Sequence, residues 1–424
     1  MTTELLHARP GPEATGGGPP RAPDRAFLRQ SRRQALRACI ALMCTLAKWA
    51  TSTAGPADDG AVHLSFTADQ TQISLSMQLP PNATYSTDAY AEFDPLGGSI
   101  SGPTEDIVGT APRLRQAYWR FRWNSGGDAI MVGQADALFG DLDAGQTLDS
   151  LPLALGAVFG REPQVRYTHV ARFDAATQLT YAVSLNAPNA GLFDESMGAT
   201  HVTHVPFVHA KIGYQSNRSP QPGNSAAEGR SAVPAQVSVS GFIGRRRTPT
   251  MFGASTDVTA WGAALGGVLP IARGHGSEAV PSAVLRAQAW LGQQLDGYFG
   301  GNGQGVYETA AGHVGGIRAH GGFVEASWIL SPRVNFSAGY SIDRNDLDKL
   351  VRHGVTFVID SGLFGGGTPG APGLNQGRNA NTALWYQPFK RAFVGLVWDY
   401  RMVNYNSGAI GASNRVSVWM SGKF

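Results

Sequence analysis

The sequence predicts an all-β protein, specifically a transmembrane antiparallel β-barrel. Three features of the 424-residue chain support this class. Apolar and polar residues alternate in runs of about ten, the connections between runs are alternately tight and long, and no run beyond the N-terminal segment approaches the roughly 20 apolar residues that a spanning helix needs. We therefore expect 16 strands with short periplasmic turns and long extracellular loops in a bacterial outer membrane.

Residues 1–54 are predicted to be an N-terminal extension and signal peptide. A basic stretch at 29–37 precedes a short apolar core at 38–47, and Ser52-Thr53-Ala54 offers a small-x-small cleavage site. We expect export, with residues 55–424 forming the barrel.

The same segment also looks like a twin-arginine signal over residues 31–37. That route carries folded proteins, whereas a barrel must reach its insertase unfolded, so the general route is expected. Both cysteines, Cys39 and Cys44, lie in this segment. The exported chain is therefore predicted to have no disulfide and no cysteine-ligated metal.

Charge argues against a nucleic-acid partner. The whole chain carries +3, and residues 1–54 hold eight Lys or Arg against three Asp or Glu, a net of +5. The remainder is therefore near −2, so bulk charge gives no support for nucleic-acid binding.

The barrel strands are expected from residue 62 onward. In chain order they are 62–67, 70–78, 84–93, 113–123, 128–137, 164–173, 177–186, 207–215, 235–244, 257–268, 283–293, 320–330, 333–343, 377–387, 391–402 and 413–424. The short run Val62–Thr67 is included because an even count with periplasmic turns requires a rising strand before 70–78.

The strands between 113 and 173 carry the pattern on which the fold prediction depends. In 113–123 one face holds Ala117, Trp119, Phe121 and Trp123, and the other holds Gln116, Tyr118, Arg120 and Arg122. In 164–173 Val165, Tyr167, His169, Ala171 and Phe173 oppose Arg166, Thr168, Val170 and Arg172. Apolar and basic faces on successive strands indicate a wall with lipid outside and water inside.

The connections follow the same scheme. Tight turns are expected at 80–82, 124–127, 174–177, 331–332 and 388–390, and long loops near 94–112, 138–163, 187–206, 294–319, 344–376 and 403–412. The connections 216–234 and 269–282 are longer than periplasmic turns should be, which leaves the register between 207 and 293 open. In the last strand Val416, Val418, Met420, Gly422 and Phe424 share a face, and a terminal aromatic resembles the signal read by the barrel-insertion machinery.

The loop 138–163 is expected to fold inward and narrow the lumen. Its charged residues are Asp141, Asp143, Asp149 and Arg161, and the facing wall would be built from Arg120, Arg122, Arg166 and Arg172. Opposed charges across a narrow channel orient dipolar solutes and hold anions transiently. The alternative places these arginines near the rims. Arg113 and Arg115 could face either way, and Arg245-Arg246-Arg247 is interpreted as a rim cluster after a strand.

Part of this region resembles the DcaP-like outer-membrane porins. The matching residues are Arg113–Tyr118, Val132-Gly133-Gln134, Gly156–Phe159 and Arg161–Thr168, in the order and spacing of that family. The resemblance covers about residues 72–190. It implies a trimeric barrel that passes small anionic solutes, and it adds Gln134 to the predicted pathway.

No metal, cofactor or catalytic residue is predicted. His201, His204 and His209 fall within nine residues, but Pro206 and the strand at 207 split their directions. The glycine-rich run 300–305 lacks a following Lys-Ser/Thr and a strand-to-helix setting, so it is interpreted as an external loop.

The expected function is a passive porin for small hydrophilic solutes, with anionic solutes as the expected class. The alternatives are a non-conducting adhesin or structural barrel, and an outer-membrane hydrolase, for which no recognisable motif is present. The expected partners are outer-membrane lipid and lipopolysaccharide, the insertion machinery and two further copies of the chain.

Overall fold

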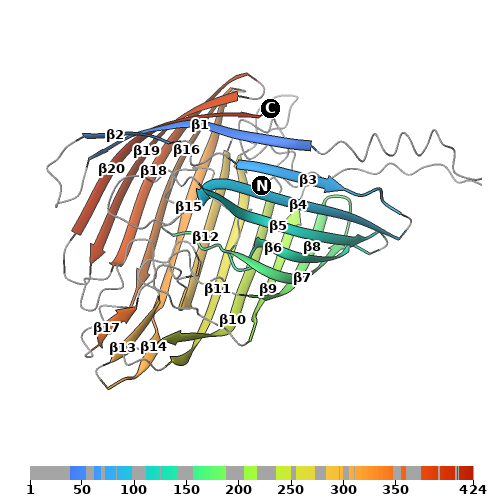
Figure 1. Ribbon diagram of the computed structural model, residues 1–424. Helices are drawn as coiled ribbons and strands as arrows, with labels where there is room; N and C mark the ends of the chain where they lie inside the picture. Colours follow the sequence, from blue (N-terminus) through green and yellow to red (C-terminus); the bar gives the residue numbers. More distant parts are fainter. Residues whose placement is uncertain are drawn as a thin grey trace, which may run out of the picture.

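The structure is a computed structural model, and it describes a large part of the chain. The described residues are 39–53, 62–67, 72–82, 84–97, 111–124, 126–140, 156–187, 205–216, 235–249, 255–272, 283–295, 297–298, 305–309, 311–331, 333–346, 355–359, 374–389, 392–405, 408 and 410–423. Strands dominate these ranges (Figure 1). Within them, no helix is long and apolar enough to cross a membrane, a result that concerns helices alone.

The strands occur in the following order. They are β1 (Cys39–Thr53), β2 (Val62–Thr67), β3 (Gln72–Gln78), β4 (Tyr85–Gly97), β5 (Ala111–Trp123), β6 (Asp128–Asp136), β7 (Arg161–Arg172), β8 (Thr177–Asn186), β9 (Phe207–Ser216), β10 (Ala235–Pro249), β11 (Ser255–Ala272), β12 (Ala283–Gln293), β13 (Val306–Thr309), β14 (Val314–Gly316), β15 (Arg318–Ser331), β16 (Val334–Asn345), β17 (Val355–Ile359), β18 (Leu374–Phe389), β19 (Ala392–Tyr405) and β20 (Ile410–Lys423).

Antiparallel pairing joins the wall strands into a closed circuit. From β3 to β12 each strand pairs with the next, and the wall continues through β15, β16, β18, β19 and β20. Strand β1 then pairs with β20 on one side and with β3 on the other, which returns the circuit to its start. The described residues thus form a 17-stranded sheet in which a closed circuit of pairings runs from β3 to β20 and returns through β1.

The sixteen predicted strands are all present in this sheet, but the first one is arranged differently. Strand β2 pairs with the Lys48–Thr53 part of β1, and β3 pairs with the Cys39–Met43 part. Both are antiparallel to β1, so β2 and β3 run in the same direction, one after the other. This corrects the expectation that 62–67 rises and 70–78 descends. The reason is that β1 offers one long row of backbone donors and acceptors for both segments.

Strand β1 comes from the segment that the sequence assigns to a signal peptide. Removal of residues 1–54 on export stays a prediction, and residues 1–38 lie outside the described part of the chain. The same alternation of apolar and small polar residues that suits an export signal also suits a barrel strand.

Exposure confirms which strand faces point outward. On β8 the Val183 residue is 45% exposed, whereas its neighbour Ser184 is 2% exposed. The apolar faces of β5 and β7 are likewise exposed, at Trp119, Phe121 and Tyr167 among others. An exposed apolar face opposite a buried polar face is the pattern of a barrel that has lipid outside and a polar interior.

A second, three-stranded sheet lies at the long-loop end of the barrel. It has the order β14-β13-β17, and β13 and β17 belong to different loops, one after β12 and one after β16. Figure 1 shows this sheet beyond the ends of the barrel strands. Two long loops are therefore joined outside the membrane-spanning wall.

Candidate functional site: the channel interior

A β-bulge in β5 determines which arginines face the interior. Glu92 of β4 pairs with Gln116, but the next residue, Phe93, pairs with Leu114, so Arg115 is the additional residue on β5. In an unbroken strand Arg113 and Arg115 would share the outward face with Trp119. The bulge shifts the alternation by one residue.

Both arginines consequently bind carboxylates on the inner face of β4. Arg113 Nη2 lies 2.6 Å from Asp94 Oδ2, Arg115 Nε lies 2.6 Å from Glu92 Oε1, and Arg115 Nη1 lies 3.1 Å from the same Asp94 oxygen. The structure thus decides the orientation of two arginines that alternation alone leaves open.

The regular part of β5 carries two more inward arginines. Arg120 Nη2 lies 2.8 Å from Asp88 Oδ2, and Arg122 Nη2 lies 2.9 Å from Asp88 Oδ1. The side chains of Arg120 and Arg122 are 30% and 40% exposed, whereas that of Asp88 is 9% exposed. The shared carboxylate is therefore shielded, and the two guanidinium groups are its more exposed partners.

The charged wall extends onto β6 and β7 where the loop 138–163 begins and ends. Arg161 Nε lies 3.0 Å from Asp136 Oδ1, and Gln116 Nε2 donates a hydrogen bond of 3.2 Å to Asp136 Oδ2. Arg166 Nε donates to Gln164 Oε1 at 2.9 Å, and Arg166 Nη2 donates to the backbone carbonyl of Asp136. Arg166 therefore fixes the β6–β7 junction.

Two other predicted pathway residues lie elsewhere. Arg172 is on the inward alternation of β7 but is exposed at the tight-turn end. Gln134 shares the outward alternation with Val132, and its Nε2 donates to the carbonyl oxygens of Leu114 and Arg115 at 3.0 and 3.2 Å. Because these carbonyls belong to the bulge, Gln134 stabilises the bulge and does not line the interior.

The Arg245-Arg246-Arg247 cluster lies within the last five residues of β10 and not after a strand, which corrects the predicted strand end. Arg246 is buried on the inward face, and Arg245 and Arg247 are exposed on the outward face. Strand β10 is longer than its apolar alternation suggests, since its pairing with β11 continues through Pro249.

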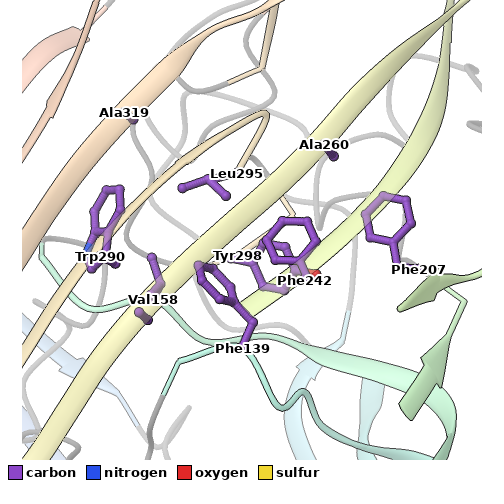
Figure 2. Close-up of a cluster of buried hydrophobic side chains, with 10 residues drawn as sticks. Phe139, Val158, Phe207, Phe242, Ala260, Trp290, Leu295, Tyr298 and Ala319 are labelled. Atoms are coloured by element: carbon purple, nitrogen blue, oxygen red, sulfur yellow. The ribbon is translucent and has the colours of Figure 1, made fainter. Parts of the chain in front are cut away.

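The wall that continues from β9 to β12 and β15 holds two segments of the predicted constriction loop, 138–140 and 156–160. Phe139 and Val158 belong to a buried hydrophobic cluster inside the barrel, whose other members are Phe207, Phe242, Ala260, Ala264, Trp290, Leu295, Tyr298 and Ala319 (Figure 2). The Phe139 ring centroid lies 4.8 Å from that of Phe242 and 5.0 Å from that of Tyr298. Aromatic edge-to-face contacts thus hold the loop base against β10 and the chain after β12.

Backbone hydrogen bonds fix the same two segments to the wall. Gly140 N donates to Ser240 Oγ at 3.2 Å, Val158 N donates to Gln288 Oε1 at 2.8 Å, and Trp290 Nε1 donates to the Gly156 carbonyl at 2.9 Å. Gly156 has φ +82°, and a Cβ atom there would lie 2.5 Å from the Gly322 carbonyl oxygen. Only glycine fits this close approach to β15.

A buried polar network secures the far end of the loop. Asn186 Nδ2 donates to Glu162 Oε2 at 2.6 Å, and His209 Nε2 lies 3.4 Å from that oxygen. Tyr298 Oη lies 3.2 Å from His209 Nε2. His209 therefore joins the loop end to β9 and to the chain after β12. Within the described ranges, no group of three or more His, Cys, Asp or Glu is arranged to hold a metal ion.

Several predicted residues lie outside the described part of the chain, and their placement stays a prediction. They are the loop acids Asp141, Asp143 and Asp149, the histidines His201 and His204, and the terminal Phe424.

Sequence reasoning missed the wall carboxylates. Asp88, Glu92 and Asp94 alternate along 84–93 and its continuation, and Asp136 ends the run 128–137. The even spacing of Asp88, Glu92 and Asp94 puts them on one face of a strand next to 113–123, and this was the signal that could have found them.

The solved structures that resemble this barrel are outer-membrane channels. The DcaP channel of Acinetobacter baumannii has a TM-score of 0.66 at 17% identity, over 91% of this chain and 96% of that one. The anion-selective porin of Comamonas acidovorans has a TM-score of 0.51 at 10% identity, over 91% and 98%. OprB of Pseudomonas putida has a TM-score of 0.50 at 11% identity, over 94% and 97%. No protein-family model and no curated protein sequence matches the chain.

These likenesses concern the fold. They confirm the predicted barrel class and the predicted resemblance to the DcaP-like architecture, and they agree with a bacterial outer-membrane location. The exposed apolar outer face supports the same location independently.

Proposed function

We propose that the protein is a passive outer-membrane channel for small hydrophilic solutes and that it favours anions. The observation that carries this proposal is the arrangement at Asp88, where a shielded carboxylate aims the more exposed Arg120 and Arg122 at the interior. The DcaP and Comamonas structures named above are both described as channels or porins, which supports the general class.

Steric selection would come from the loop 138–163. Its two described segments are fixed to the wall by Phe139, Val158 and the glycines at 140 and 156, so the residues between them start and end inside the barrel. We infer that this loop narrows the passage and that Asp141, Asp143 and Asp149 face the arginine wall.

Electrostatic selection would come from the arginines on β5. A guanidinium group stays charged over the physiological pH range and binds a carboxylate or phosphate through two parallel donors. Since Asp88 occupies only part of the donor sets of Arg120 and Arg122, a passing anion can bind transiently to the remaining donors. The wall acids keep the local net charge low, so binding stays weak enough for release.

Ion selectivity of the purified channel tests the proposal. In planar bilayers with a salt gradient, Arg120→Gln/Arg122→Gln should shift the reversal potential toward cation permeability, since two inward charges are lost. Arg344→Gln is the matched control because its side chain is exposed on the outward face of β16. An unchanged permeability ratio in the double variant would remove these arginines from the pathway.

The same recordings separate the alternatives. A steady open conductance supports the channel, and a folded barrel without channel events would support a structural or adhesive role. We propose no covalent chemistry and no cofactor. Assembly into a homotrimer, implied by the resemblance, is part of this proposal.

A further inference from the structure

A group of basic residues faces outward at the long-loop end of β15, β16 and β18. It consists of Arg318, His320, Arg344 and Arg378, named here the outer basic group. The side chains of Arg318, His320 and Arg344 are exposed, and that of Arg378 is half-buried. None of these residues belongs to the interior wall described above.

The strand register brings these residues together. His320 pairs directly with Arg344 across β15 and β16, and Arg378 pairs with Ile342, two residues before Arg344 on β16. Directly paired residues on neighbouring strands have Cβ atoms about 5 Å apart, and diagonal neighbours about 7–8 Å. Arg318 precedes His320 by two residues, so Arg344 is a diagonal neighbour of both Arg318 and Arg378. The three arginine side chains can therefore reach one ligand.

The alternation of burial shows that the group is outside the barrel. The residues that flank it in sequence, Ala319, Asp343, Asn345 and Asn379, are all buried on the inward face. Asp343 accepts a hydrogen bond from the Gly377 amide at 3.0 Å and so points away from the group. In the described residues, no ion pair joins Arg318, His320, Arg344 or Arg378 to a carboxylate.

The outer basic group lies at the level of the membrane boundary along the strands. The outward residues of β16 are, in order, Phe336, Ala338, Tyr340, Ile342 and Arg344. Tyr400 of β19 lies in the same row across the sheet as Tyr340. Interfacial tyrosines mark the level where hydrocarbon ends. Arg344 lies four residues beyond Tyr340, roughly 13 Å along the strand, which is the headgroup layer.

Arg378 is already oriented for this layer. Its Nη2 donates to Gln376 Oε1 at 3.1 Å, and Asn404 Nδ2 donates to the same oxygen at 3.3 Å. Gln376 pairs with both Arg344 and Asn404 across the sheet. The side-chain amides of Gln376 and Asn404, in one row with Arg344, supply further hydrogen-bond donors on the same surface.

We propose that the outer basic group binds the phosphate groups of an outer-leaflet glycolipid, with Arg318, Arg344 and Arg378 as the principal contacts. The site lies at the extracellular boundary because the long loops are extracellular. A lipid phosphate suits it since arginine binds phosphate oxygens bidentately and the headgroup layer adjoins these side chains. This inference does not depend on conduction through the barrel.

Binding of bisphosphorylated lipid A to the purified full-length protein in detergent tests the proposal. Arg318→Gln/Arg344→Gln/Arg378→Gln should weaken binding on the order of a hundredfold, because each arginine near a charged lipid surface contributes roughly fivefold. Removing the phosphates from the lipid should weaken its binding to the unaltered protein similarly. Arg120→Gln/Arg122→Gln, which alters inward arginines, should leave binding unchanged.

Three results would overturn the proposal. The first is equal lipid A binding by the triple variant. The second is full displacement of lipid A by an equal concentration of inorganic phosphate, which would indicate a site for the free ion. The third is a loss of trimers in the triple variant with lipid binding retained, which would make the group a contact between subunits. An unaltered far-UV circular dichroism spectrum of the triple variant shows that the barrel has folded.

Discussion

The two inner walls of this barrel are built from different kinds of side chain. The wall of β4 to β7 is lined with arginine and carboxylate pairs, for example Arg120 with Asp88 and Arg113 with Asp94. The wall of β9 to β12 presents Phe207, Phe242 and Trp290 to the base of the loop. One wall carries the ion pairs that we propose solutes meet, and the other provides the apolar surface on which the described ends of the loop pack.

This division accounts for where the two described ends of the loop pack. Apolar side chains gain free energy by covering one another. Phe139 therefore packs against Phe242 and Tyr298, away from the ion pairs of β4 and β5. We propose that the passage runs between the loop and the arginine-bearing wall.

The largest effect is expected when the apolar wall loses its hold on the loop. Phe139→Ala removes a fully buried ring and should destabilise the seated loop by about 3–5 kcal/mol. We expect larger single-channel conductance with more frequent fluctuations, measured in planar bilayers. Trp119→Ala, on the outward face of β5, is the control that deletes an aromatic ring without touching the loop. Identical conductance in Phe139→Ala and the unaltered protein would show that the loop does not limit flow.

A smaller effect, and one of opposite sign to that of the arginine variant, is expected from the charged wall. Asp88→Asn removes the carboxylate shared by Arg120 and Arg122. The loss of one negative charge about 4 Å from the passage corresponds to roughly 1 kcal/mol in water, or about fivefold in the anion-to-cation ratio. The reversal potential should therefore shift toward anions. A shift toward cations would mean that the arginines depend on Asp88 for their positions more than they are neutralised by it.

The smallest effect is expected from a change beside the β-bulge at Arg115 in β5. Gln134→Met keeps the side-chain length but removes the donors to the Leu114 and Arg115 carbonyls, at a cost of about 1 kcal/mol. The midpoint of thermal unfolding should fall slightly, and selectivity should change little. A shift in selectivity as large as that of Arg120→Gln/Arg122→Gln would show that Gln134 belongs to the pathway after all.

Sequence patterns located the strands well because the side-chain period of a strand is local. The alternation in 113–123 and 164–173 gave the correct faces for Trp119, Arg120, Tyr167 and Arg166. It could not orient Arg113 and Arg115, since the bulge at Arg115 depends on pairing with Glu92 and Phe93 of a neighbouring strand. Gln134 was misassigned for a different reason: the family resemblance added it to the pathway, although the alternation of 128–137 places it on the outward face with Val132.

The sequence by itself determined the class of this protein, because repeated ten-residue runs with one apolar and one polar or basic face, joined alternately by tight and long connections, are typical of a wall between lipid and water. Only the tertiary structure decided which carboxylate accompanies each arginine, how β2 and β3 share β1, and where the loop is held. These features depend on contacts between residues far apart in the chain, such as Phe139 with Tyr298 and Val158 with Gln288. Strand register and closure of the barrel bring such residues together, and neither can be predicted from a single segment of the sequence.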